Sequence, residues 1–227
     1  MNWVANNLDL IWELTLVHLR QSVIAIILGF VLSLPLGWLA WRYRVARGGI
    51  LTVTGLLYTI PSLALLMIIP VILGTAPFNE VNLILALTIY AIALMTRSVT
   101  DGLGSVDPAV RLSATAMGYG AGRRFWAVDF PLAGPVILAG LRVTAVSTIA
   151  LATVGALIGV TNLGYLFTNG SQRRIIPEVL AGIIAVVIIA LVVDALLIVA
   201  GRALMPWSRV QRRRARRGRL PLEVSVA

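Results

Sequence analysis

The sequence has no cysteine, no lysine and a single histidine among its 227 residues. Without cysteine, disulfide bonds and thiol chemistry are excluded. Without lysine, the usual P-loop is excluded, because its G-x-x-x-x-G-K-[ST] motif needs the lysine to reach the ATP phosphates. One histidine without clustered carboxylates offers neither a metal site nor an acid–base centre. We therefore expect no catalytic residue, no bound metal and no cofactor in this chain.

Charged residues are scarce as well. They make up 12% of the chain, against about a quarter in soluble domains, and 59% of residues are hydrophobic. Ser22–Trp41 and Ile50–Leu73 contain no ionisable residue of the Asp, Glu, Arg or His type. Such runs match the roughly 20 apolar residues that cross a bilayer core, and they are continuous rather than alternating, which excludes β-strands. We predict an all-α polytopic membrane protein with about five spanning helices, at about 20–41, 50–74, 79–99, 134–159 and 178–203.

The residues before the first long apolar run read as an amphipathic lead-in over 1–19. They lack the basic start of a signal peptide, and acidic residues precede the apolar run. We expect the apolar side chains of this lead-in to lie in the membrane interface, namely Trp3, Leu8, Ile11 and Trp12.

Arginines gather in alternate loops. They follow the first, third and fifth predicted spans, whereas the loop GTAPFNEV after the second span has none. Because cytoplasmic loops carry the arginine excess, we expect the N-terminus outside and the C-terminus inside, with Arg173 and Arg174 as exceptions outside. The basic cytoplasmic tail, 204–227, is expected to contact anionic lipid head groups. No aromatic residues interleave with its arginines, so we do not expect a nucleic-acid partner.

The longest cytoplasmic loop, about 100–133, holds a polar island in an otherwise apolar chain. Asp107-Pro108 is a helix start, and Gly118 is suited to end that short helix in a left-handed conformation. A second short helix is expected at about 123–129, with Pro131 ending the pattern. The sequence thus predicts two short helices joined at a glycine elbow beneath the membrane.

This island resembles the EAA loop of ABC importer permeases. That pattern is Glu-Ala-Ala, three residues, Gly, nine residues and Ile-x-Leu-Pro, and this chain keeps the spacing without a gap. Leu112 replaces the leading glutamate, so we expect arginines of the loop to make other contacts. The resemblance implies an ATPase-coupling loop formed by Arg111, Ser113, Ala114, Gly118, Arg123, Arg124, Val128, Phe130 and Pro131.

Further stretches resemble the osmoprotectant branch of that family, among them YTIPSLALL, LTIYAIALMTRSVTDGL and ATVGALIGVTNLGYLFTNG. The resemblance covers about 15–203 and implies a type I ABC importer transmembrane domain over 20–203, in the inner or plasma membrane of a prokaryote. It implies uptake of glycine betaine, choline or carnitine. It also implies three partners: a second permease subunit, identical or similar, a nucleotide-binding ATPase that holds ATP and Mg²⁺, and an extracytoplasmic substrate-binding protein.

Two alternatives stay open. The first alternative to an osmoprotectant permease is a permease for methionine or another small solute that has the same loop. The second, less in keeping with the sequence, is a self-standing channel or membrane scaffold. A channel would be expected to show a filter or a ring of pore charges, and the sequence shows none.

Pro61 lies in the middle of the second predicted span and should break it, because proline lacks the N–H that a helix needs. Neighbouring hydroxyls can satisfy the freed backbone groups. The break is either a packing kink or a lining of the translocation path, for which the candidates are Thr59, Pro61, Ser62 and Tyr90. The aromatic residues are scattered along the chain, so no aromatic cage for a quaternary amine is predicted.

Two ionisable residues lie within predicted spans, Arg142 and Asp194. Each is costly in the membrane unless paired, and the predicted topology puts both about two turns from the cytoplasmic end of their helices. The two residues are therefore candidates for an ion pair, and a structural role, by neutralisation or by snorkelling to the interface, is favoured over a role in moving solute.

Overall fold

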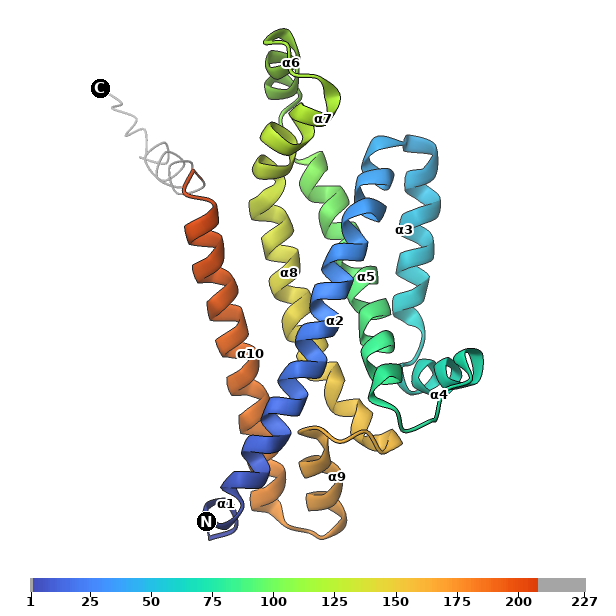
Figure 1. Cartoon of the computed structure of the whole chain (residues 1–227), viewed down its shortest axis with the longest axis vertical. Coiled ribbons are helices and arrows are strands. Elements are labelled where there is room, and N and C mark those ends of the chain that lie inside the picture. Colours follow the sequence, from blue (N-terminus) through green and yellow to red (C-terminus); the bar gives the residue numbers. More distant parts are fainter. Residues whose placement is uncertain (1, 208–227) are drawn as a thin grey trace, which may run out of the picture.

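The structure is a computed structural model that describes residues 2–207, and every regular element in that range is a helix (Figure 1). The part of the predicted tail from residue 208 onward lies outside the described residues. The elements are α1 (Asn2–Asn6), α2 (Leu8–Arg42), α3 (Arg44–Thr59), α4 (Ser62–Leu73), α5 (Glu80–Gly104), α6 (Pro108–Ala116), α7 (Ala121–Arg124), the π-helix η1 (Phe125–Asp129), α8 (Phe130–Ala152), the 3₁₀-helix η2 (Thr153–Ile158), α9 (Gly164–Gln172) and α10 (Ile176–Leu204).

Four stretches are long and apolar enough to cross a membrane: α2, α5, the helical run 121–158 that contains α8, and α10. The bent pair α3–α4 makes a fifth if it is taken as one span. The prediction of an all-α membrane protein with about five spans is confirmed. The side on which each terminus lies stays a prediction.

The first span begins earlier than expected. α2 is one helix of 35 residues from Leu8, so most of the predicted lead-in belongs to it. Nothing breaks the helix there, since neither glycine nor proline occurs between residues 8 and 28. Burial of Leu14 and His18 also holds this first part of the helix against the bundle.

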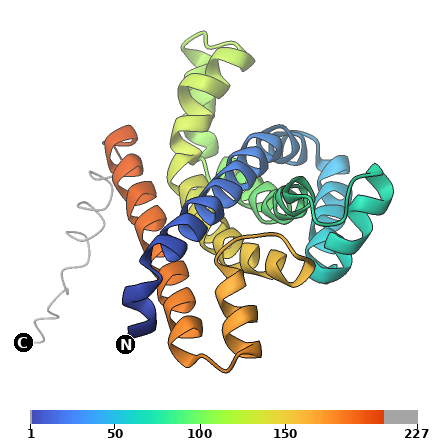
Figure 2. The same cartoon turned by 60° about the horizontal axis from the view of Figure 1, so that its bottom comes forward.

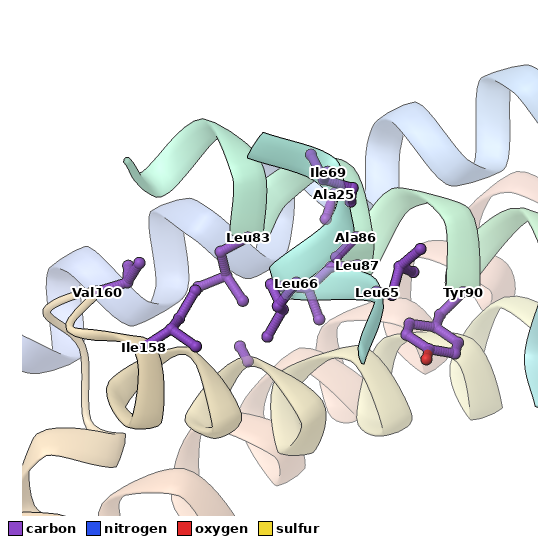
Figure 3. Close-up of a cluster of buried hydrophobic side chains, with 11 residues drawn as sticks. Ala25, Leu65, Leu66, Ile69, Leu83, Ala86, Leu87, Tyr90, Ile158 and Val160 are labelled. Atoms are coloured by element: carbon purple, nitrogen blue, oxygen red, sulfur yellow. The ribbon is translucent and has the colours of Figure 1, made fainter. Parts of the chain in front are cut away.

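The second span is broken more sharply than a continuous helix over 50–74 would allow. α3 and α4 are bent by 103° where Ile60 and Pro61 take extended backbone angles. Proline disfavours the helical region for the residue before it, which accounts for the conformation of Ile60. The break at Pro61 is as predicted, and the pair counts as one broken span that begins at Arg44, earlier than the predicted residue 50. Figure 3 shows Leu65, Leu66 and Ile69 of α4 packed beside Leu83 and Leu87 of α5.

The predicted stop at Pro131 was also wrong. The chain runs on helically from Ala121 into α8, and Phe130 keeps helical angles. Pro131 lies in the first turn of α8, where a missing N–H costs little, and the preceding π-helix is a place where regular hydrogen bonding is interrupted anyway. The fourth span therefore starts within the predicted loop of about 100–133 and not near residue 134.

The centre of the bundle is made by α2, α5 and α8, which approach closely through glycines. A Cβ atom on Gly29 would lie 2.3 Å from Ala91 Cβ, and one on Gly37 would lie 2.5 Å from Val99 Cβ. Such small residues let helices pack in a membrane, where no hydrophobic force drives them together. α10 stands at one edge of the bundle and the α3–α4 pair at the opposite edge in both views (Figures 1 and 2).

Candidate coupling site and translocation path

A hairpin of short helices, residues 107–130, projects beyond one end of the bundle (Figure 1). Its first limb, α6, starts where the Asp107 side chain accepts a 2.8 Å hydrogen bond from the backbone N–H of Ala109. Gly118 ends this limb with φ +85°, and no atom lies within 4 Å of a Cβ built there. The glycine is therefore needed for its left-handed backbone and not for space.

A buried carboxylate joins the two limbs of the projecting hairpin. Asp129 is 1% exposed, and its Oδ1 lies 2.8 Å from Nε of Arg111 on α6. Its Oδ2 lies 3.3 Å from Nε of Arg124 on α7. We call these three residues the Asp129 clamp. A buried charge is tolerated only when it is paired in this way, so the clamp fixes one limb against the other.

The clamp also reaches the bundle. Arg111 donates through Nη2 to the carbonyl of Leu103, near the end of α5, and its guanidinium lies 4.9 Å from the ring centroid of Trp41 on α2. Arg124 donates through Nη1 to Thr115 Oγ1 at 3.0 Å. One set of contacts thus connects the hairpin to the ends of α5 and α2 that lie nearest to it, as well as to α8.

The predicted coupling residues fall into two groups. Arg111, Ala114, Arg124, Val128, Phe130 and Pro131 are buried or half-buried and hold the hairpin, whereas Ser113, Gly118 and Arg123 are exposed. Ser113 uses its hydroxyl within the helix, on the Ala109 carbonyl, and Arg123 lies over the Tyr119 ring at 4.7 Å.

The hairpin exposes apolar side chains on both limbs. Leu112 is 73% exposed, Met117 69% and Trp126 67%. Exposed apolar patches of this kind mark sites of protein or membrane contact.

Sequence reasoning missed Asp129. The residue occupies the variable position of Ile-x-Leu-Pro, and the only signal was an acidic side chain between Val128 and Phe130 in an apolar stretch. Its partners lie 18 and 5 residues away, so the turn of the π-helix had to be known before the three could be brought together.

The candidate path residues meet at the α3–α4 break, residues 59–62. The Tyr90 hydroxyl of α5 donates to the carbonyl of Ile60, and Thr59 Oγ1 donates to the Leu56 carbonyl at 2.7 Å. Tyr58, which the sequence did not single out as a path residue, packs on Tyr90 with ring centroids 6.0 Å apart and planes at 86°. The structure therefore adds one aromatic residue to the predicted set.

Arg142 of α8 and Asp194 of α10 lie together as a bidentate pair. Arg142 Nε is 2.6 Å from Oδ1, and Nη2 is 2.7 Å from Oδ2. The pair ties α10, which is otherwise at the edge of the bundle, to the central helices. No group of three or more His, Cys, Asp or Glu side chains placed to hold a metal occurs in residues 2–207.

These features together define a class. A bundle of about five spans with a projecting hairpin of short helices between two of them is the transmembrane domain of a type I importer permease. The chain belongs to the family of binding-protein-dependent transport system inner membrane components, whose sequence profile matches residues 21–210. It is accordingly a multi-pass protein of the inner membrane.

Three relatives indicate where in the family the chain lies. It is 34% identical to the choline transport system permease protein OpuBB of Bacillus subtilis (strain 168), over 83% of this chain and 86% of that one. It is 37% identical to the carnitine transport permease protein OpuCB of Listeria monocytogenes, over 78% and 80%. It is 30% identical to the osmoprotectant import permease protein OsmW of Salmonella typhimurium, over 87% and 93%.

Solved structures share the fold at lower identity. The inward-facing MetNI methionine ABC transporter matches with a TM-score of 0.72 at 22% identity, covering 86% of this chain and 94% of that one. An amino acid ABC transporter crystallised with histidines matches with a TM-score of 0.74 at 17% identity, covering 88% and 96%. At these identities the likeness establishes the fold alone.

The bidentate pair predicts a charge-swap result. Arg142→Asp leaves two carboxylates facing each other, and Asp194→Arg leaves two guanidinium groups, so each should lower the thermal unfolding midpoint in detergent. The double variant restores opposite charges and should recover much of the loss. A double variant that is no more stable than either single variant would show that the two side chains do not interact directly.

The Asp129 clamp predicts that Asp129→Asn loosens the projecting hairpin, because two guanidinium groups are left together without an anion. The chain has no cysteine, so spin labels on Ser113→Cys and Ala127→Cys would be the only ones. We expect Asp129→Asn to broaden the distance distribution between the two labels.

Asp101→Asn is the matched control. Asp101 is half exposed, and its carboxylate oxygens lie 3.7 Å from nitrogens of Arg47 and Arg97. Asp101→Asn therefore removes the same charge as Asp129→Asn, but from an exposed pair and not from a buried clamp. It should leave the distribution unchanged. Equal distributions in wild type and Asp129→Asn would contradict the role of the clamp.

Proposed function

We propose that this chain is the permease subunit of an importer for quaternary amine osmoprotectants such as glycine betaine, choline and carnitine. The observation that carries the proposal is its identity of 30–37% to choline, carnitine and osmoprotectant permeases over most of both chains. The methionine alternative is supported only by a fold likeness at 22% identity. The relatives are transport permeases, which also argues against a self-standing channel or scaffold.

The importer we propose needs three further components. A second permease subunit, the same or similar, completes the pathway. A nucleotide-binding ATPase holds ATP and Mg²⁺, and an extracytoplasmic binding protein delivers the solute. Membrane lipid surrounds the bundle, and the tail 204–227 contacts its anionic head groups.

The distribution of arginine supports an orientation with the N-terminus outside and the C-terminus inside. The hairpin, the α2–α3 junction and the C-terminal end of α10 lie at one end of the bundle, and α1 and α9 at the other (Figure 1). Among residues 2–207, the arginines of the hairpin and of the helix ends beside it are therefore at this end of the bundle, namely Arg42, Arg44, Arg47, Arg111, Arg123, Arg124 and Arg202. An arginine-rich end is expected to be cytoplasmic.

We propose that the ATPase acts on the projecting hairpin. The exposed apolar side chains of the hairpin offer a surface for docking, and the Asp129 clamp makes the two limbs one body. Because the second limb continues helically into α8, a movement of the tip is a movement of that span. Rigid-body motion of packed elements between two states is a common form of gating.

The deciding experiment is reconstitution of the chain in vesicles with its ATPase and binding protein. We expect glycine betaine or choline to stimulate ATP hydrolysis and to accumulate in the vesicles, whereas methionine does neither. If methionine alone stimulated ATP hydrolysis, the chain would be a methionine permease instead. Uptake of solute without any ATPase would contradict the proposed coupling.

Gly118 provides a graded test of coupling. Valine strongly disfavours φ +85°, so Gly118→Val should distort the elbow and lower uptake per ATP hydrolysed by about tenfold or more. Asparagine tolerates left-handed backbone, so Gly118→Asn should be milder. Gly48→Val, at an open helical position with no positive φ, is the control. Wild-type uptake by Gly118→Val would exclude the elbow from coupling.

A further inference from the structure

The α3–α4 break lies at membrane depth, and no other part of residues 2–207 covers Thr59 and Pro61 there. α3 starts at Arg44 and runs 16 residues, so the break is about 24 Å along the helix from its arginine-bearing end, within a bilayer core of roughly 30 Å. Thr59 and Pro61 are exposed. Non-helical backbone in a membrane is tolerated only where protein covers it or where it lines a water-filled cavity. The break therefore faces a partner or an aqueous path and does not face lipid.

One aromatic side chain at this break, Tyr58, is exposed and packs against a buried ring. Tyr58 is 47% exposed, while Tyr90 is 5% exposed and is anchored by the bond from its hydroxyl to the Ile60 carbonyl. The edge-to-face contact between the rings, at 6.0 Å and 86°, fixes the plane of Tyr58. Tyr90 thus positions Tyr58, and the solvent-facing part of Tyr58 is free to meet a ligand.

The surroundings of this ring suit a cation without hydrogen-bond donors. A quaternary ammonium group has no N–H, so it is recognised by aromatic faces and by the negative ends of dipoles. α3 ends at Thr59, and the carbonyl end of a helix carries partial negative charge. No charged residue occurs from residue 48 to 79 or from 81 to 96. The arginines of α3 and α5 (Arg44, Arg47 and Arg97) therefore lie at least seven positions along the chain from Tyr58 and Tyr90.

We propose that Tyr58, positioned by Tyr90, forms one wall of a binding site for a quaternary ammonium group in the translocation path. This inference rests on the proposed function, and it names the residue of the permease that contacts the charged end of the solute. From the sequence, the aromatic residues are scattered and no cage for a quaternary amine is expected. The fold, however, brings together the rings of Tyr58 and Tyr90, which are 32 positions apart in the chain.

The test uses the purified permease–ATPase complex without the binding protein, so that only the permease selects the ligand. Binding of choline is compared with binding of 3,3-dimethylbutan-1-ol, its neutral isostere. We expect Tyr58→Leu to weaken choline binding by about tenfold and to leave the neutral isostere unchanged. Tyr58→Phe keeps the ring and should keep most of the affinity.

A second series separates the electrostatic role from packing. Phenylalanines with increasing fluorine content at position 58 keep the ring's shape and withdraw charge from its face, so choline affinity should fall stepwise with each fluorine. This series stays informative even where Tyr58→Leu fails to assemble. An affinity that does not change along the series would overturn the cation–π site.

Tyr43→Leu is the matched control. Tyr43 is 51% exposed and packs edge-to-face on Trp38 at 6.4 Å and 86°, but it lies at the α2–α3 junction, away from the break. It should bind choline as the wild type does. Wild-type choline binding by Tyr58→Leu would overturn the inference and leave the proposed function standing. A wild-type importer that transports no quaternary amine would instead overturn the proposed function.

Discussion

The absence of water from the bilayer core is the constraint on which the rest of the structure depends. Each backbone N–H and C=O there must find a partner within the protein, which is why the spans are helices. Close approach then depends on small residues, as where a Cβ on Gly29 would lie only 2.3 Å from Ala91. The exposed bend of 103° between α3 and α4 departs from this rule. A departure of that kind is stable only beside protein or water, so it indicates where a path through the membrane can run.

The exclusive use of arginine as the long basic side chain has a structural consequence. A guanidinium group is planar and presents several donors in a fixed fork, whereas an ammonium group is a compact point charge. Arg142 uses the fork to hold both oxygens of Asp194. Arg111 binds a carboxylate and a backbone carbonyl while its guanidinium group lies over the Trp41 ring. A lysine at position 111 could not make these three contacts together, so the joint between hairpin and bundle depends on this residue type.

Most of the fold could be predicted from hydropathy and from the residues that start and end helices. Most of the wrong predictions concerned the places where helices begin, bend or continue. Long uncharged runs located the spans, and Asp107-Pro108 and Gly118 located the first limb of the hairpin, because each signal is local. Pro131 was misleading, because a proline ends a helix in some contexts and opens one in others, and a π-helix precedes it here. The partners of Asp129 and the pairing of Tyr58 with Tyr90 depend on how helices rotate against each other. No pattern in one sequence specifies that rotation.

Replacement of the pattern's glutamate by Leu112 changes how force can reach this bundle. An exposed glutamate would give a directional contact, whereas Leu112, Met117 and Trp126 offer apolar area, whose burial is worth about 25 cal/mol per Å² and has no direction. Orientation must then come from the shape of the hairpin. The chain supplies that shape from within, since the 1% exposed Asp129 pairs the two limbs through Arg111 and Arg124. Under the proposed function, the motor therefore acts on a rigid form and not on a single ion pair.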